Sequence, residues 1–181
     1  MHPTAGVALL RGINVGRAKR VAMADLRTLF EELGFTGVRT VLNSGNVVFG
    51  SAPRALDVAG AAIEEALVRR LGVAARVTLL GAADLALVIE GNPLLGQASD
   101  PARLIAFILS CPDQHAVLAP LLQQDWAPGA LALGTHAAYV WCPGGVLDSA
   151  AAGAVAKLLG DATTARNWNT LGKLRALCQQ S

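Results

Sequence analysis

The sequence predicts an α/β (α+β) protein built from two tandem ferredoxin-like halves. Three observations support this prediction. Apolar runs and helical repeats alternate in the order β-α-β-β-α-β over about the first 80 residues, which is the ferredoxin-like unit, and the second half repeats this order loosely. The length of 181 residues allows one domain or two small ones. A hydrophobic content of 53% and a mean hydropathy of +0.45 exclude a disordered chain.

The elements of the first half follow from residue spacing. The run Val7–Leu10 is wholly apolar, which suits a strand covered on both faces. The two expected helices carry apolar residues at helical spacing, and each is followed by a glycine. An Asn/Gly-rich tetrapeptide, Asn43–Asn46, separates two β-branched runs and predicts a hairpin. The expected ranges after the first strand are helices at 23–33 and 53–71 and strands at 38–42, 47–49 and 76–80.

The second half is expected to begin after a boundary near residue 81, which gives domains of residues 1–81 and 82–181. Its last helix is predicted to start at the polar run Thr163–Thr170, where a Thr or Asn can cap the helix and Trp168 packs into the core. The expected elements are helices at 84–89, 113–122, 149–159 and 168–177, a strand at 104–109, and a hairpin of 130–133 with 138–141.

The topology predicts that two polar loops of the first half meet. The crossover makes the first two strands parallel, and the third returns antiparallel. The loop after the first strand (residues 12–19) and the hairpin at residues 43–46 therefore lie at one edge of the sheet. Residues 11–20 hold four cations and no carboxylate, although the net charge of the chain is only +2. The polar residues expected at this edge are Arg11, Asn14, Arg17, Lys19, Arg20, Asn43, Ser44 and Asn46.

Each polar segment has a structural alternative. The stretch Arg11–Gly16 can present backbone N–H groups to a phosphate, yet it has neither the dinucleotide-binding spacing nor the Gly-Lys-Ser/Thr of a P-loop. The structural alternative is a tight turn from strand to loop beside a solvated basic segment. Residues 43–46 either form a turn or line a ligand site. Arg166 and Asn167 suit a carboxylate or phosphate at a helix start, unless they only cap the helix.

The sequence offers little catalytic or metal-binding chemistry. The three His residues are scattered, and no nucleophile or metal-ligand motif is present, so catalytic residues remain unknown and no metal or cofactor is expected. Three cysteines without a Cys-x-x-Cys pair favour reduced thiols in the cytoplasm. The N-terminus lacks a signal-peptide pattern and no apolar run suits a membrane helix, so a cytoplasmic protein without a membrane partner is expected.

Three motifs carry a resemblance to a known family. The segments Ala8–Gly16, Asn43–Phe49 and Thr163–Thr170 resemble, in this order, those of the bacterial family called domain of unknown function 1697. The resemblance covers nearly the whole chain. It implies a tandem ferredoxin-like (α/β plait) fold, and it implies no function, since no activity is assigned to the family.

The residues favour binding of an anionic small molecule or a nucleic acid. Arg11, Arg17, Lys19 and Arg20 would neutralise phosphate, and the Asn and Ser side chains would add directional hydrogen bonds. Arg166 and Asn167 would complete the site if the last helix folds back over this edge. The alternatives are an enzyme for a small phosphorylated or carboxylated substrate and a structural or oligomerisation module. A homo-oligomer is possible, because the first sheet must be covered by the other half or by a second subunit.

Overall fold

The structure, a computed structural model, describes residues 5–14 and 20–180. The chain packs as two compact units. The first unit comprises residues 1–85 with 174–181, and the second comprises residues 86–173. Each unit contains a four-stranded antiparallel sheet, which confirms the predicted pair of α+β halves.

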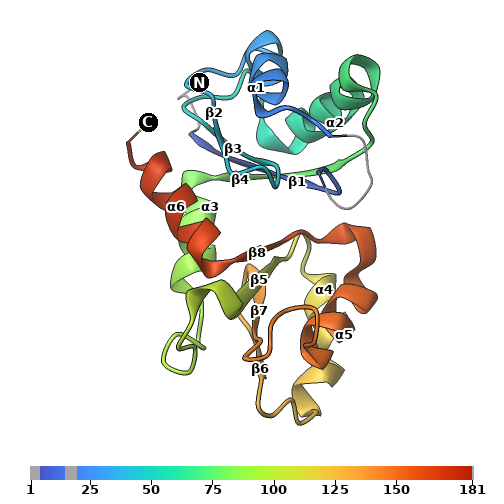
Figure 1. The fold of residues 1–181 in the computed structure, drawn as a ribbon, viewed down its shortest axis with the longest axis vertical. Helices are drawn as coiled ribbons and strands as arrows, with labels where there is room; N and C mark the ends of the chain where they lie inside the picture. Colours follow the sequence, from blue (N-terminus) through green and yellow to red (C-terminus); the bar gives the residue numbers. More distant parts are fainter. Residues whose placement is uncertain (1–4, 15–19, 181) are drawn as a thin grey trace. The chain divides into compact units, whose positions relative to one another are not determined.

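The first unit has the predicted order of elements, and its sheet runs β2-β3-β1-β4 with every neighbouring pair antiparallel. This is the strand order of a ferredoxin-like fold, in which β1 and β2 are parallel and β3 lies between them. Both helices cover one face of the sheet (Figure 1). The elements are β1 (Gly6–Arg11), α1 (Met23–Glu32), β2 (Arg39–Val41), β3 (Asn46–Phe49), α2 (Leu56–Ala66) with the π-helical turn η1 (Leu67–Leu71), and β4 (Arg76–Gly81).

Strand β1 is buried on both faces, as its continuous apolar run predicted. Ala8 and Leu10 belong to the core that lies between the sheet and the helices, together with Phe30. Val7 and Leu9 alternate with them along the strand and are also 0% exposed. The centre of this sheet is therefore covered on both faces.

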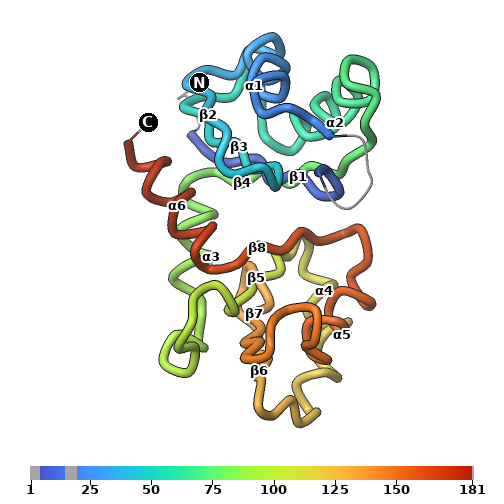
Figure 2. Tube along the Cα trace, in the orientation of Figure 1, coloured from blue at the N-terminus to red at the C-terminus, as the bar shows by residue number. Residues whose placement is uncertain are grey.

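The second unit repeats the topology of the first. Its sheet runs β6-β7-β5-β8, so β5 takes the place of β1 and β8 the place of β4. Figure 2 traces this second βαββαβ path from green to red. The elements after β4 are α3 (Ala82–Glu90), β5 (Leu104–Ile108), α4 (Asp113–Leu118) with η3 (Ala119–Gln123), β6 (Ala130–Leu133), β7 (Ala137–Trp141), α5 (Ala150–Leu159), β8 (Ala165–Asn167) and α6 (Trp168–Cys178).

One strand of the second unit was not predicted. The polar run Thr163–Thr170 was expected only to lead into the last helix, whereas its residues 165–167 form β8 and pair with β5. The predicted cap is confirmed: the Asn167 carboxamide oxygen accepts from the backbone N–H of Thr170 at 2.9 Å and from its hydroxyl at 2.8 Å. One short segment therefore ends a sheet and starts a helix. Among residues 5–14 and 20–180, no helix is long and apolar enough to cross a membrane.

Candidate functional site

The structure brings together the two loops of the first unit that topology predicted to meet. The Asn14 side-chain amide donates to the backbone carbonyl of Asn43 at 2.9 Å. The Leu10 N–H, at the end of β1, donates to the carbonyl of Gly45 at 2.8 Å. We call this end of the sheet the basic edge; its described residues are 11–14, 20–22 and the turn Leu42–Gly45. The convergence of these loops is confirmed.

Asn14 holds the connection between β1 and α1 in place. Besides bonding Asn43, its Nδ2 donates to the carbonyl of Val21 at 3.0 Å, and its Oδ1 accepts from the Val21 N–H at 2.7 Å. Its backbone is left-handed, with φ of 54°, a conformation that Asn tolerates better than most residues. The carboxamide thus bonds three backbone groups of its own chain, so its role at this edge is to position the loop.

Asn46 also forms side-chain hydrogen bonds within its own chain, in the turn between β2 and β3. Its side chain is 0% exposed, and its Nδ2 donates to the Val41 carbonyl and to the Ser44 hydroxyl oxygen, both at 3.0 Å. Gly45 has φ of 81°, and a Cβ there would lie 2.8 Å from the Ile13 side chain. The turn therefore packs tightly against the first loop, and it leaves Asn43 and Ser44 exposed.

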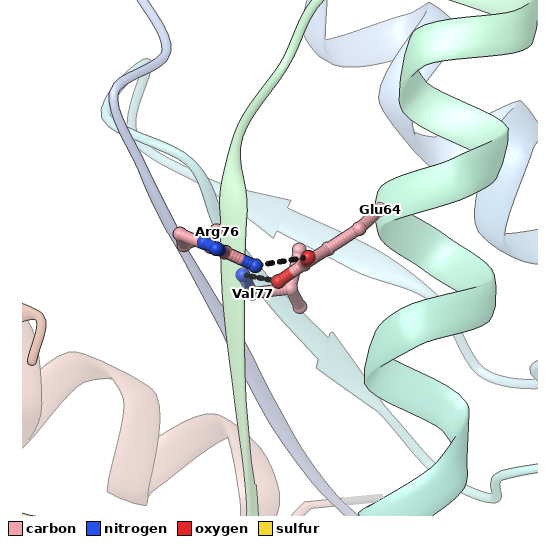
Figure 3. Close-up of polar contacts among 3 residues, drawn as sticks. All are labelled: Glu64, Arg76 and Val77. Atoms are coloured by element: carbon pink, nitrogen blue, oxygen red, sulfur yellow. Dashed lines mark hydrogen bonds and ion pairs between the residues drawn. The ribbon is translucent and has the colours of Figure 1, made fainter. Parts of the chain in front are cut away.

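Cations lie at the ends of the two strands that meet at this edge. Arg11 and Arg76 stand directly opposite each other on β1 and β4. Like charges in this position repel. Glu64 on α2 bonds Arg76 Nη1 at 3.1 Å and accepts from the Val77 N–H at 2.9 Å (Figure 3). One carboxylate thus offsets part of this charge.

The remaining cations of the edge are only partly described. Arg20 is exposed at the end of the connection. Arg17 and Lys19, two of the predicted binding residues, lie outside the described residues.

Arg166 and Asn167 belong to the second unit. Arg166 Nη1 donates to the Thr164 hydroxyl oxygen at 2.9 Å and to the Ala165 carbonyl at 2.8 Å. Burial lowers the pKa of this guanidinium to about 10, because desolvation penalises its charged form. The Asn167 carboxamide oxygen serves as the cap of α6. Whether these two residues join the basic edge in one site stays a prediction.

The second unit makes the corresponding β–α connection in another way. Residues 109–112 alone join β5 to α4, whereas residues 12–22 join β1 to α1. The short connection is held by Gln114, whose Oε1 accepts from the N–H groups of Ser110 and Cys111 at 2.7 and 3.2 Å. Its Nε2 donates to the Ala162 carbonyl at 2.9 Å. One carboxamide side chain thus anchors the first connection in each unit.

Sequence patterns did not reveal a cavity of about 310 Å³ in the second unit. It lies between the connection before β6 and the connection from β7 to α5, and Trp126, Cys142 and two aspartates contribute to its walls. The available signal was the concentration of turn-forming Pro and Gly residues in these two connections, at positions 128, 129 and 143–145. In the described part of the chain no group of three or more His, Cys, Asp or Glu residues could hold a metal ion.

Comparison with known proteins identifies the family. Residues 4–139 match the family described as protein of unknown function (DUF1697). The chain belongs to this family. The DUF1697 match covers the whole sheet of the first unit and continues into the second unit as far as Tyr139 in β7.

Among solved structures, this DUF1697 protein is similar to the conserved bacterial protein SP0830 from Streptococcus pneumoniae. The two share 22% sequence identity with a TM-score of 0.74, and the alignment covers 97% of this chain and 98% of the other. At this identity the similarity shows that the fold is shared over the whole chain. No functionally curated protein matches the sequence.

Proposed function

We propose that this DUF1697 protein binds an anionic ligand, a nucleotide or a short nucleic acid segment, at the basic edge of its first unit. The observation that carries the proposal is the difference between the two β–α connections. The connection from the first strand to the first helix has four residues, 109–112, in the second unit. It has eleven residues, 12–22, in the first unit. Connections of two to six residues are usual for this step. The added length therefore needs a reason other than the fold.

The positive charge of this connection suggests a reason for its added length. The segment 11–20 contains Arg11, Arg17, Lys19 and Arg20 and no acidic residue. The second unit has no Lys or Arg at residues 109–115. Clustered guanidinium and ammonium groups recognise phosphate through charge-assisted hydrogen bonds. The four cations are proposed as the groups that contact the anion.

The amides of the edge support the proposal, because they bond the described ends of the connection to each other and to the turn. Asn14 joins the connection to the turn between β2 and β3, and Asn46 closes that turn from within. Their hydrogen bonds stay within the chain. The exposed side chains of Asn43 and Ser44 are therefore proposed as the directional contacts to ligand. Because Asn14 bonds the Asn43 carbonyl and Asn46 bonds the Ser44 hydroxyl, Asn43 and Ser44 lose less conformational entropy when they bind.

Arg166 is proposed as an anion contact of the second unit. Its partial burial makes it a stronger electrostatic partner than a fully solvated arginine, because water screens it less. This part of the proposal can fail while the basic edge stands, since the two lie in different units.

A thermal-shift screen tests the proposal. The ligands are nucleotides, sugar phosphates and short DNA and RNA oligomers, each at low and high salt. A ligand at about 100 times its Kd stabilises a protein by about 2.7 kcal/mol, which for this length is a rise of roughly 5–10 °C. For a single strand, log K falls with log salt with a slope of about −0.7 per phosphate contacted. A single nucleotide contacts fewer phosphates and gives a shallower slope.

Replacing single arginines by alanine tests which of them contact the ligand. Arg11→Ala and Arg20→Ala are expected to reduce the shift, and Arg166→Ala reduces it only if both units share the ligand. Arg69→Ala is the matched control, because Arg69 is an exposed arginine of the first unit that pairs with Glu65 at 3.5 Å. No shift with any ligand, or an equal loss in the Arg69 control, would refute an anion site at the basic edge.

A further inference from the structure

We propose that the cavity of the second unit binds a small organic ammonium ion with an apolar body. It occupies about 310 Å³ between the connections 124–129 and 142–149. This is the lower end of the volume range of small-molecule sites, roughly 300–1,000 Å³. The inference concerns another unit and the opposite ligand charge, so it does not depend on the proposed function of the basic edge.

The walls of the cavity are held by internal hydrogen bonds. The Trp126 indole N–H donates to the Leu121 carbonyl at 2.8 Å. The Gly145 N–H donates to the Cys142 carbonyl at 2.8 Å, which closes the turn after β7. Arg103 bonds the Pro143 carbonyl through its guanidinium. The cavity is therefore formed before a ligand arrives, which lowers the cost of binding.

The charge of the lining is negative. Asp125 and Asp148 are its ionisable carboxylates, and no Lys or Arg is among the lining residues. Over the described ranges 5–14 and 20–180, no ion pair involves either aspartate. One oxygen of Asp125 accepts from the Ala127 N–H at 2.9 Å, which leaves its second oxygen for another donor.

The partial positive charge at the N-terminus of α5 does not outweigh the negative charge of the cavity lining. A helix N-terminus carries about half a positive charge, against two full negative charges. The Arg103 guanidinium, which bonds the Pro143 carbonyl, is itself paired with Asp100 at 3.5 Å. The Ser149 hydroxyl oxygen also accepts from the Ala152 N–H at 3.2 Å, so one of the free helix donors is already satisfied. Cys142 adds no charge, because burial raises the pKa of its thiol, although a hydrogen bond with Ser149 acts in the opposite direction.

The apolar part of the lining suits the body of such a ligand. Trp126 packs against the core of the second unit and also lines the cavity, beside Pro128 and Pro143. Its only polar atom is already bonded, so the ring offers an apolar and π surface. Tryptophan is the side chain that attracts organic cations most strongly. Carboxylates and an indole face together favour an amine over a neutral or anionic molecule.

Titration followed by NMR on the full, ¹⁵N-labelled chain tests the inference. The probes are 2-phenylethylamine, which is cationic at pH 7, and its neutral analogue 2-phenylethanol. The amine is expected to shift the amide signals of Gly129, Gly144 and Gly145 and the Trp126 indole signal. Affinity for the amine should exceed that for the alcohol by roughly two- to fivefold for each exposed carboxylate. The difference should shrink as salt is raised.

The variant Asp125→Asn/Asp148→Asn separates charge from shape. It is expected to lower amine affinity to the level of the alcohol and to leave alcohol affinity unchanged. Glu65→Gln is the matched control, because Glu65 is an exposed carboxylate of the first unit that pairs with Arg69. Equal affinities of the two probes in the unmodified protein, unmoved lining signals, or full amine affinity in the double variant would each overturn the inference. Retained chemical-shift dispersion shows that the double variant is folded.

Discussion

The two units share a strand order and differ in how they join their first strand to their first helix. In the second unit Gln114 anchors a connection of four residues, and in the first unit Asn14 anchors one of eleven. Each anchor is a carboxamide that bonds three or more groups of its own unit. Because the second unit makes the same step with four residues, we expect that the length and charge of residues 12–22 are not needed for folding. The same molecule thus provides an internal control for function.

The largest expected effect concerns the turn that meets the long connection. Gly45 and Gly12 both have positive φ, 81° and 84°. A Cβ at Gly45 would lie 2.8 Å from Ile13 Cδ1, whereas one at Gly12 meets nothing within 4 Å. Gly12→Ala should cost about 1–2 kcal/mol from backbone strain, and Gly45→Ala about 2–4 kcal/mol, because overpacking adds to the strain. Urea unfolding measures both, and equal costs would show that the turn can move away from Ile13.

Removing either anchor should have a smaller effect. Asn14→Ala and Gln114→Ala each leave backbone groups without their partner, and we expect each to cost about 1–3 kcal/mol in urea unfolding. Only Asn14→Ala is expected to weaken binding of the anion, because the second connection has no part in the site. Asn14→Gly separates the lost hydrogen bonds from the strain of placing Ala at positive φ. Equal loss of binding in the Gln114 variant would remove the distinction between the two connections.

Alkaline pH should destabilise both units through one buried thiol each. Burial raises the pKa of Cys142 and of Cys178 above 9.0, with the Arg39 charge acting the other way on Cys178. Well below pH 9 both thiols are protonated in the folded and unfolded chain, so they leave stability unchanged. Above pH 9 the unfolded chain loses protons that the folded chain keeps, so stability falls, by at most about 1.4 kcal/mol per pH unit for each thiol.

Urea unfolding between pH 8 and 10 measures this slope. Cys142→Ala/Cys178→Ala should flatten it, and Cys111→Ala, at an exposed cysteine, is the control. An unchanged slope in the double variant would assign the pH dependence to other groups.

The sequence predicted the order of most elements and the meeting of the two loops, because apolar periodicity and the handedness of β-α-β crossovers are local or general rules. It did not predict β8. Ala165–Asn167 is three residues long and has no β-branched member, so its strand character depends on pairing with β5, more than fifty residues away. Strand conformation here is a tertiary property.

The roles of Asn14 and Asn46 were equally beyond the sequence. Asn residues between strands suit a turn, an internal hydrogen bond or a ligand contact alike. Only the structure shows that both carboxamides bond their own backbone. The cavity of the second unit was missed for the same reason, since its walls come from two connections that the sequence does not relate to each other.

The smallest expected effect on stability belongs to the residues proposed to bind. The variant Arg11→Gln/Arg17→Gln/Lys19→Gln/Arg20→Gln removes the positive charge of the basic edge and keeps its polar surface. Its free energy of unfolding is expected to change by no more than about 0.5 kcal/mol for each replaced cation, as for substitutions that remove no fold-stabilising contact. A larger loss would mean that these cations serve the fold, and the comparison of the two connections would no longer indicate function.

The central claim is that these cations serve an anion and not the fold. Calorimetric titration of the unmodified protein and of the four-site variant, with ATP and with a short single-stranded oligonucleotide at low salt, tests it most directly. We expect the unmodified protein to bind at least one of the two and the variant to bind it at least about tenfold more weakly, with affinity falling as salt rises. Equal affinity in both proteins, or no binding of either ligand by the unmodified protein, would contradict the account.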